Sequence, residues 1–90
     1  MIHINIRVTG RVQGVNYRAS AKLKAEELGA CGFIKNEKDG SVYLEAEGPE
    51  EKINELLAWC KQGPPHAHVT NVISSPGGLN GLSGFEIRRW

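Results

Sequence analysis

The chain has 90 residues, which is enough for one small domain and too few for two. Its 11 basic and 10 acidic residues leave a net charge of +1, which excludes a protein that holds nucleic acid by phosphate neutralisation alone. Apolar residues make up 40% of the chain, as in folded proteins, and no apolar run approaches the roughly 18 residues of a membrane span.

The first part of the chain predicts a strand, a helix and a second strand. Residues 2–9 alternate between apolar and polar side chains, as in a strand with one buried face. Over residues 17–28 apolar side chains recur at helical spacing; Asn16 is a candidate N-cap, and Gly29 ends the helix. Residues 31–36 predict the second strand.

The middle of the chain predicts a hairpin followed by a second helix. Asp39-Gly40 is a strong hairpin signal, and residues 41–47 then alternate as a third strand. Pro49 suits the first position of a helix, because the N–H that proline lacks would be unpaired there. The sequence Gly63-Pro64-Pro65 ends this helix.

The last part of the chain completes the fold prediction. Residues 67–73 predict a fourth strand whose broken alternation indicates a bulge, residues 74–84 a flexible loop, and residues 85–87 a short fifth strand. The order β-α-β-β-α-β plus a short strand predicts an α+β, ferredoxin-like sandwich, a single domain over residues 1–90. Its two helices lie on one face of a mostly antiparallel sheet. This fold hosts many activities, so it does not define a function.

The segment between the first strand and the first helix is the best candidate for a binding site. Gly10 and Gly14 allow successive backbone N–H groups to point to one side, and the helix start adds further free N–H groups. Together they predict an anion cradle for one phosphoryl group. Arg18, in the first helical turn, opposes the helix dipole unless an anion lies beside it; the alternative is a solvated surface arginine.

Asn36 ends the second strand, just before a turn. Because β-α-β crossovers make their strands parallel, Asn36 is expected at the same end of the sheet as residues 10–18. Its amide oxygen could orient a water while its amide nitrogen donates nearby. The alternative is an ordinary turn asparagine.

Three stretches resemble the signature sequences of the acylphosphatase family and together span nearly the whole chain. The first is Gly10-Arg11-Val12-Gln13-Gly14-Val15-x-Tyr17-Arg18. The second runs from Gly32-Phe33-Ile34-Lys35-Asn36 to Glu47-Gly48, and the third is Gly63-Pro64-Pro65-x-Ala67-x-Val69. The chain departs from the family pattern at Tyr17, Ile34 and Ala19-Ser20, positions that bear on pocket shape and rate.

The resemblance implies an enzyme that hydrolyses acyl phosphates to a carboxylate and inorganic phosphate, without a metal or other cofactor. By resemblance, Arg18 binds the phosphate and Asn36 positions the attacking water. Because the sequence offers no obvious histidine or carboxylate base, we expect an oxygen of the substrate phosphate to accept the proton of the water. The residues of the phosphate-binding loop are Gly10, Arg11, Val12, Gln13, Gly14, Val15, Asn16 and Tyr17.

Two other functions compete with this interpretation. A non-catalytic anion- or metabolite-binding module would keep the cradle but has no need for Asn36 opposite it. An RNA-binding domain shares the strand order, but the third strand offers only Tyr43 as a stacking residue. The partners expected are therefore an acyl phosphate and inorganic phosphate, with no nucleic acid or membrane, and the chain is expected to be a monomer.

The remaining candidate residues are assigned ordinary structural roles. Cys31 is not expected to be a nucleophile, and His66 and His68 lack a third metal ligand, so no metal site is expected. Trp59 and Trp90 are expected to pack rather than stack on bases. The acids Glu45, Glu47, Glu50 and Glu51 are expected to form a solvated face and a helix start.

Two cysteines do not make a disulfide framework. Buried thiols in a reducing compartment are favoured for Cys31 and Cys60, although a bridge between them stays open from the sequence. The N-terminus has no basic stretch followed by an apolar core, so we expect a cytoplasmic protein without a signal peptide.

Overall fold

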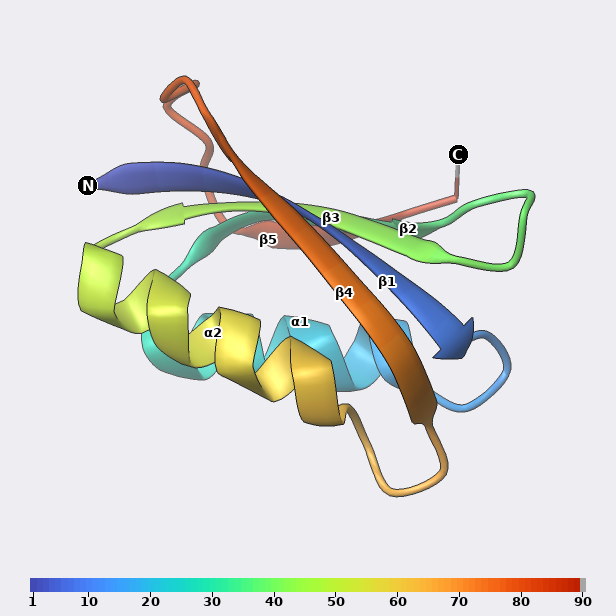
Figure 1. Cartoon of the computed structure of the whole chain (residues 1–90). Helices are drawn as coiled ribbons and strands as arrows, with labels where there is room; N and C mark the ends of the chain where they lie inside the picture. Colours follow the sequence, from blue (N-terminus) through green and yellow to red (C-terminus); the bar gives the residue numbers. More distant parts are fainter. Residues whose placement is uncertain (90) are drawn as a thin grey trace.

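Five strands form one mixed sheet, and two helices cover one of its faces (Figure 1). The computed structural model describes residues 1–89. The elements are β1 (Ile2–Arg11), α1 (Tyr17–Leu28), β2 (Cys31–Asn36), β3 (Val42–Gly48), α2 (Glu50–Gln62), β4 (His68–Gly77) and β5 (Phe85–Arg88). The strand order is β4-β1-β3-β2-β5; within residues 1–89, β2 and β5 pair in parallel and the other neighbouring strands pair antiparallel. The predicted α+β ferredoxin-like sandwich is confirmed.

The hydrophobic core lies between the sheet and the helices. Ile6 and Val8 of β1 are fully buried on this side, as their alternation with polar residues predicts. Tyr17 begins α1 and packs against Trp59 of α2, with the ring centroids 5.3 Å apart, so Trp59 is a packing residue. Trp90 lies outside the described residues. The helices also bury Ala21, Ala25 and Leu28 of α1 and Ile53, Leu56 and Cys60 of α2.

One end of the sheet gathers the segments predicted to carry the chemistry. β1 and β2 flank β3 and are both antiparallel to it, so they run in the same direction. The end of β1, the end of β2 and the start of α1 therefore lie at the same end of the sheet (Figure 1). The crossover argument is confirmed, and Asn36 does lie near the loop before α1.

The predicted flexible loop over residues 74–84 is partly wrong. Ser74 to Gly77 continue β4 and pair with β1, in a register that joins Ile6 to Ser74 and His3 to Gly77. Their side chains are exposed and show no apolar alternation, so the sequence does not mark them as a strand. Pairing with the backbone of β1 holds them in the sheet. The predicted bulge is confirmed: the register shifts opposite Thr9 and Gly10. α2 begins at Glu50, so Pro49 is its N-cap and not its first residue.

Gly10 is required by a close backbone contact rather than by an open loop. It has φ +123° within β1, and a Cβ built on it would lie 2.2 Å from the carbonyl oxygen of His68. No L side chain fits there without moving β4.

We expect Gly10→Ala to lower the free energy of unfolding by at least about 2 kcal/mol, measured by urea denaturation. Gly78→Ala is the matched control, because a Cβ on Gly78 meets nothing within 4 Å. Equal stability of the two variants would contradict the assigned contact.

Neither helix in the described part of the chain is long and apolar enough to cross a membrane.

Candidate active site

The chain enters α1 through two left-handed residues. Gly14 has φ +73° and Asn16 has φ +66°; Asn16 is the one non-glycine residue with positive φ among residues 1–89. Asn16 occupies the predicted N-cap position, but its side chain makes no capping hydrogen bond and instead reaches Ser20 Oγ at 3.5 Å. The predicted N-cap position of Asn16 is confirmed, although its left-handed backbone and not a side-chain hydrogen bond starts the helix.

This entry leaves the start of α1 ready to bind an anion. In the described part of the chain, no protein acceptor takes a hydrogen bond from the backbone N–H groups of residues 12–19. The first turn of α1 has no acidic side chain, whereas α2 begins with Glu50 and Glu51. No acidic side chain therefore offsets the positive end of the α1 helix dipole. Left-handed turns like the one before α1 make concavities that bind anions.

A single cavity of about 180 Å³ brings the predicted site residues together. Arg18 and Asn36 both line it, from α1 and from the end of β2. The volume is several times that of a water, which suits one phosphoryl group and a water. The lining residues are Val12, Gly14, Asn16, Tyr17, Arg18, Ala19, Asn36 and Ile87.

The other residues of the predicted loop lie outside this lining. Gly10 and Arg11 belong to the end of β1, where they pair with β4. Val15 packs against the hydrophobic core. The Gln13 side chain reaches the β2–β3 turn, where it forms two hydrogen bonds.

Arg18 is half-buried, and no carboxylate in the described chain forms an ion pair with it. Its place at the second position of α1 is electrostatically unfavourable by about 0.3–1 kcal/mol when no anion is present. A bound anion reverses the sign of that interaction. The guanidinium can also form two parallel hydrogen bonds to phosphate oxygens.

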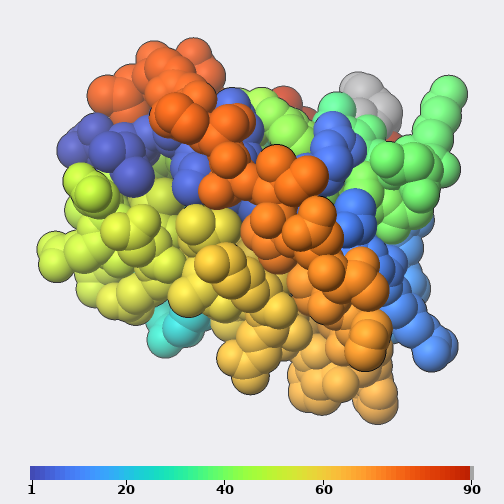
Figure 2. Space-filling model, viewed as in Figure 1, coloured from blue at the N-terminus to red at the C-terminus, as the bar shows by residue number. Residues whose placement is uncertain are grey.

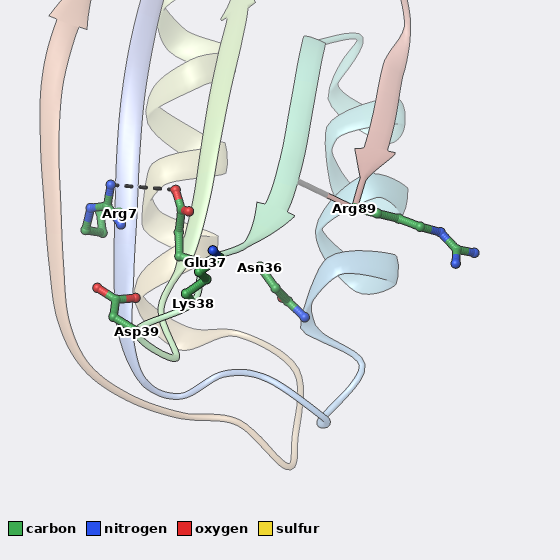
Figure 3. Close-up of a pocket in the computed structure, with 6 residues that line it drawn as sticks. All are labelled: Arg7, Asn36, Glu37, Lys38, Asp39 and Arg89. Carbon is green, nitrogen blue, oxygen red and sulfur yellow. Dashed lines mark ion pairs between the residues drawn. The ribbon is translucent and has the colours of Figure 1, made fainter.

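Asn36 carries an unusual side-chain amide. Its Oδ1 is buried, and no donor in the described chain pairs with it. Its side chain points toward the loop that precedes α1 (Figure 3). A buried amide oxygen without a partner costs about 1–3 kcal/mol, so stability does not explain why asparagine is found here.

A second hollow, of about 450 Å³, lies beside the cavity and shares Asn36 with it (Figure 3). Arg7 pairs with Glu37 across this hollow at 3.8 Å. Asp39 accepts hydrogen bonds from the hydroxyl and backbone N–H of Ser41, and these bonds lower the pKa of Asp39. Lys38 and Arg89 also line this hollow.

The face of the sheet opposite the helices carries a buried charged cluster that the sequence does not predict. His3 is only 4% exposed; its Nδ1 lies 2.8 Å from a Glu47 oxygen, and its Nε2 lies 2.9 Å from a Glu45 oxygen. Glu47 is equally buried and accepts hydrogen bonds from the backbone N–H groups of Asn80 and Leu82. The expectation of a solvated face is therefore wrong for Glu47, because the β4–β5 loop folds over it.

The cluster makes stability depend on pH. Burial alone lowers the pKa of His3, but hydrogen bonds with Glu47 and Glu45 outweigh it, and the pKa is raised. The protonated His3 therefore stabilises the fold fully below its unfolded pKa of about 6.5, and this contribution is lost as pH rises through the folded pKa. The hydrogen bond from the Asn80 backbone N–H lowers the pKa of Glu47, so its contribution is lost in acid.

We expect the free energy of unfolding to fall as pH rises above about 6.5, and His3→Gln to remove this fall. The measurement is urea denaturation from pH 6 to pH 9. His66→Gln serves as the control, because His66 is exposed and should leave the slope intact. An unchanged slope in His3→Gln would mean that another group causes the dependence.

The fold and the cavity together define a class of protein. An α+β sandwich in which free N–H groups, an unpaired arginine and an asparagine amide surround one small cavity has the groups that suit binding of a phosphoryl group. The sequence profile of the family described as acylphosphatase matches residues 4–87. The chain belongs to the acylphosphatase family.

Individual relatives agree with this assignment. An acylphosphatase of Methylococcus capsulatus is 54% identical over 72 residues, which cover 80% of this chain and 78% of that protein. One of Synechococcus sp. (strain RCC307) is 48% identical over 82 residues, 91% of this chain and 70% of that protein. The crystal structure of acylphosphatase from Bacillus subtilis superposes with a TM-score of 0.95 at 35% identity, covering 98% of this chain and 99% of the other. The predicted family is confirmed.

Ile87 of β5 was not predicted as a site residue. It lines the cavity beside Asn36 and is 39% exposed. β5 pairs with β2 and not with its neighbour in sequence, so only the parallel pairing of Ile34 with Ile87 shows that the side chain reaches this end.

Proposed function

We propose that the chain hydrolyses the carboxyl–phosphate anhydride bond of acyl phosphates and releases a carboxylate and inorganic phosphate. One observation carries this proposal: a single small cavity is lined by the free start of α1, by Arg18 and by Asn36. Membership of the acylphosphatase family supports it.

Binding of the phosphoryl group is assigned to the loop and to Arg18. The N–H groups of residues 12–17 surround the phosphoryl oxygens, and the Arg18 guanidinium completes the positive lining. Phosphoryl transfer passes through a state with charge spread over the equatorial oxygens, so fixed N–H donors stabilise it without reorganisation. The carboxylate is a good leaving group and needs little acid catalysis.

Asn36 is assigned to the attacking water. Half a turn of its amide about the Cβ–Cγ bond brings the buried oxygen to the cavity, where a water supplies the donor that the protein does not. None of the described lining residues is a histidine, cysteine or carboxylate. The Tyr17 hydroxyl donates to the Cys60 carbonyl at 2.8 Å, and burial raises the pKa of Tyr17, so it is no base either. We therefore assign the proton to an oxygen of the substrate phosphate.

Hydrolysis of benzoyl phosphate in excess EDTA tests the proposal. The expected result is release of benzoate and inorganic phosphate at the same rate with and without EDTA. Binding of inorganic phosphate without hydrolysis would instead identify an anion-binding module.

The proposed partners are small molecules, and the proposed state is a cytoplasmic monomer. The thiols of Cys31 and Cys60 are unpaired, and burial raises the pKa of Cys60 to about 12, which suits a reducing compartment. RNA binding is not favoured, because the Tyr43 hydroxyl donates to Glu45 at 2.6 Å and the cations of Arg7 and Lys35 lie over its ring. A base would have to displace these contacts to stack there.

A further inference from the structure

The side chain of Gln13 joins the loop before α1 to the β2–β3 turn. Its Nε2 donates to the carbonyl oxygen of Glu37 at 2.8 Å and to that of Ser41 at 2.9 Å. These two carbonyls lie on the two sides of the β2–β3 turn, which is itself closed by a hydrogen bond from the Glu37 N–H to the Ser41 oxygen. Figure 2 shows the surface of the loop after β1 directly beside the surface of this turn.

The connection is specific to these two segments. No other side-chain hydrogen bond in the described chain links residues 12–16 to residues 37–41. Arg7 also holds the turn, through Ser41 Oγ at 3.0 Å, but Arg7 belongs to β1, and none of its side-chain hydrogen bonds in the described chain reaches residues 12–16. Gln13 therefore supplies the side-chain hydrogen bonds that join the loop to the turn in the described chain.

The distance between the loop and the turn matters because the loop is assigned to the phosphoryl group, and Asn36, next to the turn, is assigned to the attacking water. The loop supplies the N–H groups for the phosphoryl group, and Asn36 immediately precedes Glu37, whose carbonyl Gln13 holds. A displacement of about 1 Å between a nucleophile and its target can lower a rate by about 10²-fold. The two hydrogen bonds of Gln13 can fix the distance between the loop and the turn, and with it the distance between the phosphoryl group and the water.

We propose that Gln13 is a positioning residue, whose side-chain amide fixes the distance between the phosphate-binding loop and the water held by Asn36. The inference rests on the proposed function. It goes beyond the loop backbone, because the Gln13 side chain faces the turn and not the cavity lining.

Gln13→Met tests the inference, since methionine keeps the length of the side chain and removes both donors. Its kcat on benzoyl phosphate is expected to fall about 10- to 100-fold, while the inhibition constant of inorganic phosphate changes less than about 3-fold. Gln62→Met, at an exposed position of α2, is the matched control and should keep wild-type values. An unchanged kcat, or equal losses of kcat and phosphate affinity, would overturn the inference.

Gln13→Asn keeps the amide but is one methylene too short to reach both carbonyls. It is expected to show the same selective loss of kcat, and it answers the question if Gln13→Met does not fold. A wild-type kcat for Gln13→Asn would overturn the inference.

A double-mutant cycle with Asn36→Ala separates this inference from the proposed function. Once Asn36 is absent, adding Gln13→Met should lower kcat less than about 2-fold. If the two losses multiply, Gln13 acts independently of Asn36, and the inference fails while the proposed function stands. If Asn36→Ala alone keeps the wild-type kcat, the proposed role of Asn36 fails, and the inference fails with it.

Discussion

Arg18→Gln is expected to abolish phosphate binding and turnover together. Glutamine cannot carry the charge or make the forked pair of hydrogen bonds that a guanidinium offers a phosphoryl group. The Arg18 guanidinium also stabilises charge as it spreads over the phosphoryl oxygens. We therefore expect kcat/KM on benzoyl phosphate to fall by at least about 10³-fold.

The same substitution should not weaken the fold. Arg18 places a cation in the first turn of α1, where the helix dipole opposes it by about 0.3–1 kcal/mol. Its removal should leave the free enzyme equally stable or slightly more stable in urea denaturation. Arg88→Gln, at an exposed arginine of β5, is the matched control and should keep activity. Measurable phosphate affinity in Arg18→Gln would show that the guanidinium is not the anion ligand.

Asn36→Ala is expected to separate binding from turnover. The N–H groups and Arg18 remain in place, so the inhibition constant of phosphate should stay within about 3-fold of wild type, while kcat falls about 10²- to 10³-fold. Stability should not suffer, because the substitution removes a buried oxygen that has no partner.

Asn54→Ala on α2 is the matched control, since Asn54 is exposed and α2 contributes no residue to the lining of the cavity. A near-wild-type kcat for Asn36→Ala would contradict the assignment of the water to Asn36. A loss of phosphate affinity as large as the loss of kcat would instead make Asn36 a binding residue.

The parts of the fold that the sequence predicts are those in which burial sets the pattern. Alternation at Ile4, Ile6 and Val8 defined β1, and the helical spacing of Tyr17, Ala21 and Ala25 defined α1. The handedness of crossovers then placed Asn36 at the correct end of the sheet. The fold, and the placement of Arg18 and Asn36 around one cavity, could therefore be predicted from the sequence.

The features that the sequence did not predict depend on contacts between distant segments. The buried partner of His3, Glu47, is covered by the β4–β5 loop, which is distant from both residues in the sequence and donates two backbone hydrogen bonds to Glu47. Ile87 reaches the cavity through a parallel pairing that has no local signal. The partners of Gln13 are backbone carbonyls, which every residue has, so composition cannot identify them.

The central claim is that the start of α1 and Arg18 hold one phosphoryl group while Asn36 faces it across the cavity. A crystal structure with inorganic phosphate tests this most directly. The expected result is a phosphate bound by the N–H groups of residues 12–17 and by the Arg18 guanidinium, with a water between the phosphorus and the Asn36 amide. A phosphate bound instead in the neighbouring hollow, on Lys38 and Arg89, would contradict the account.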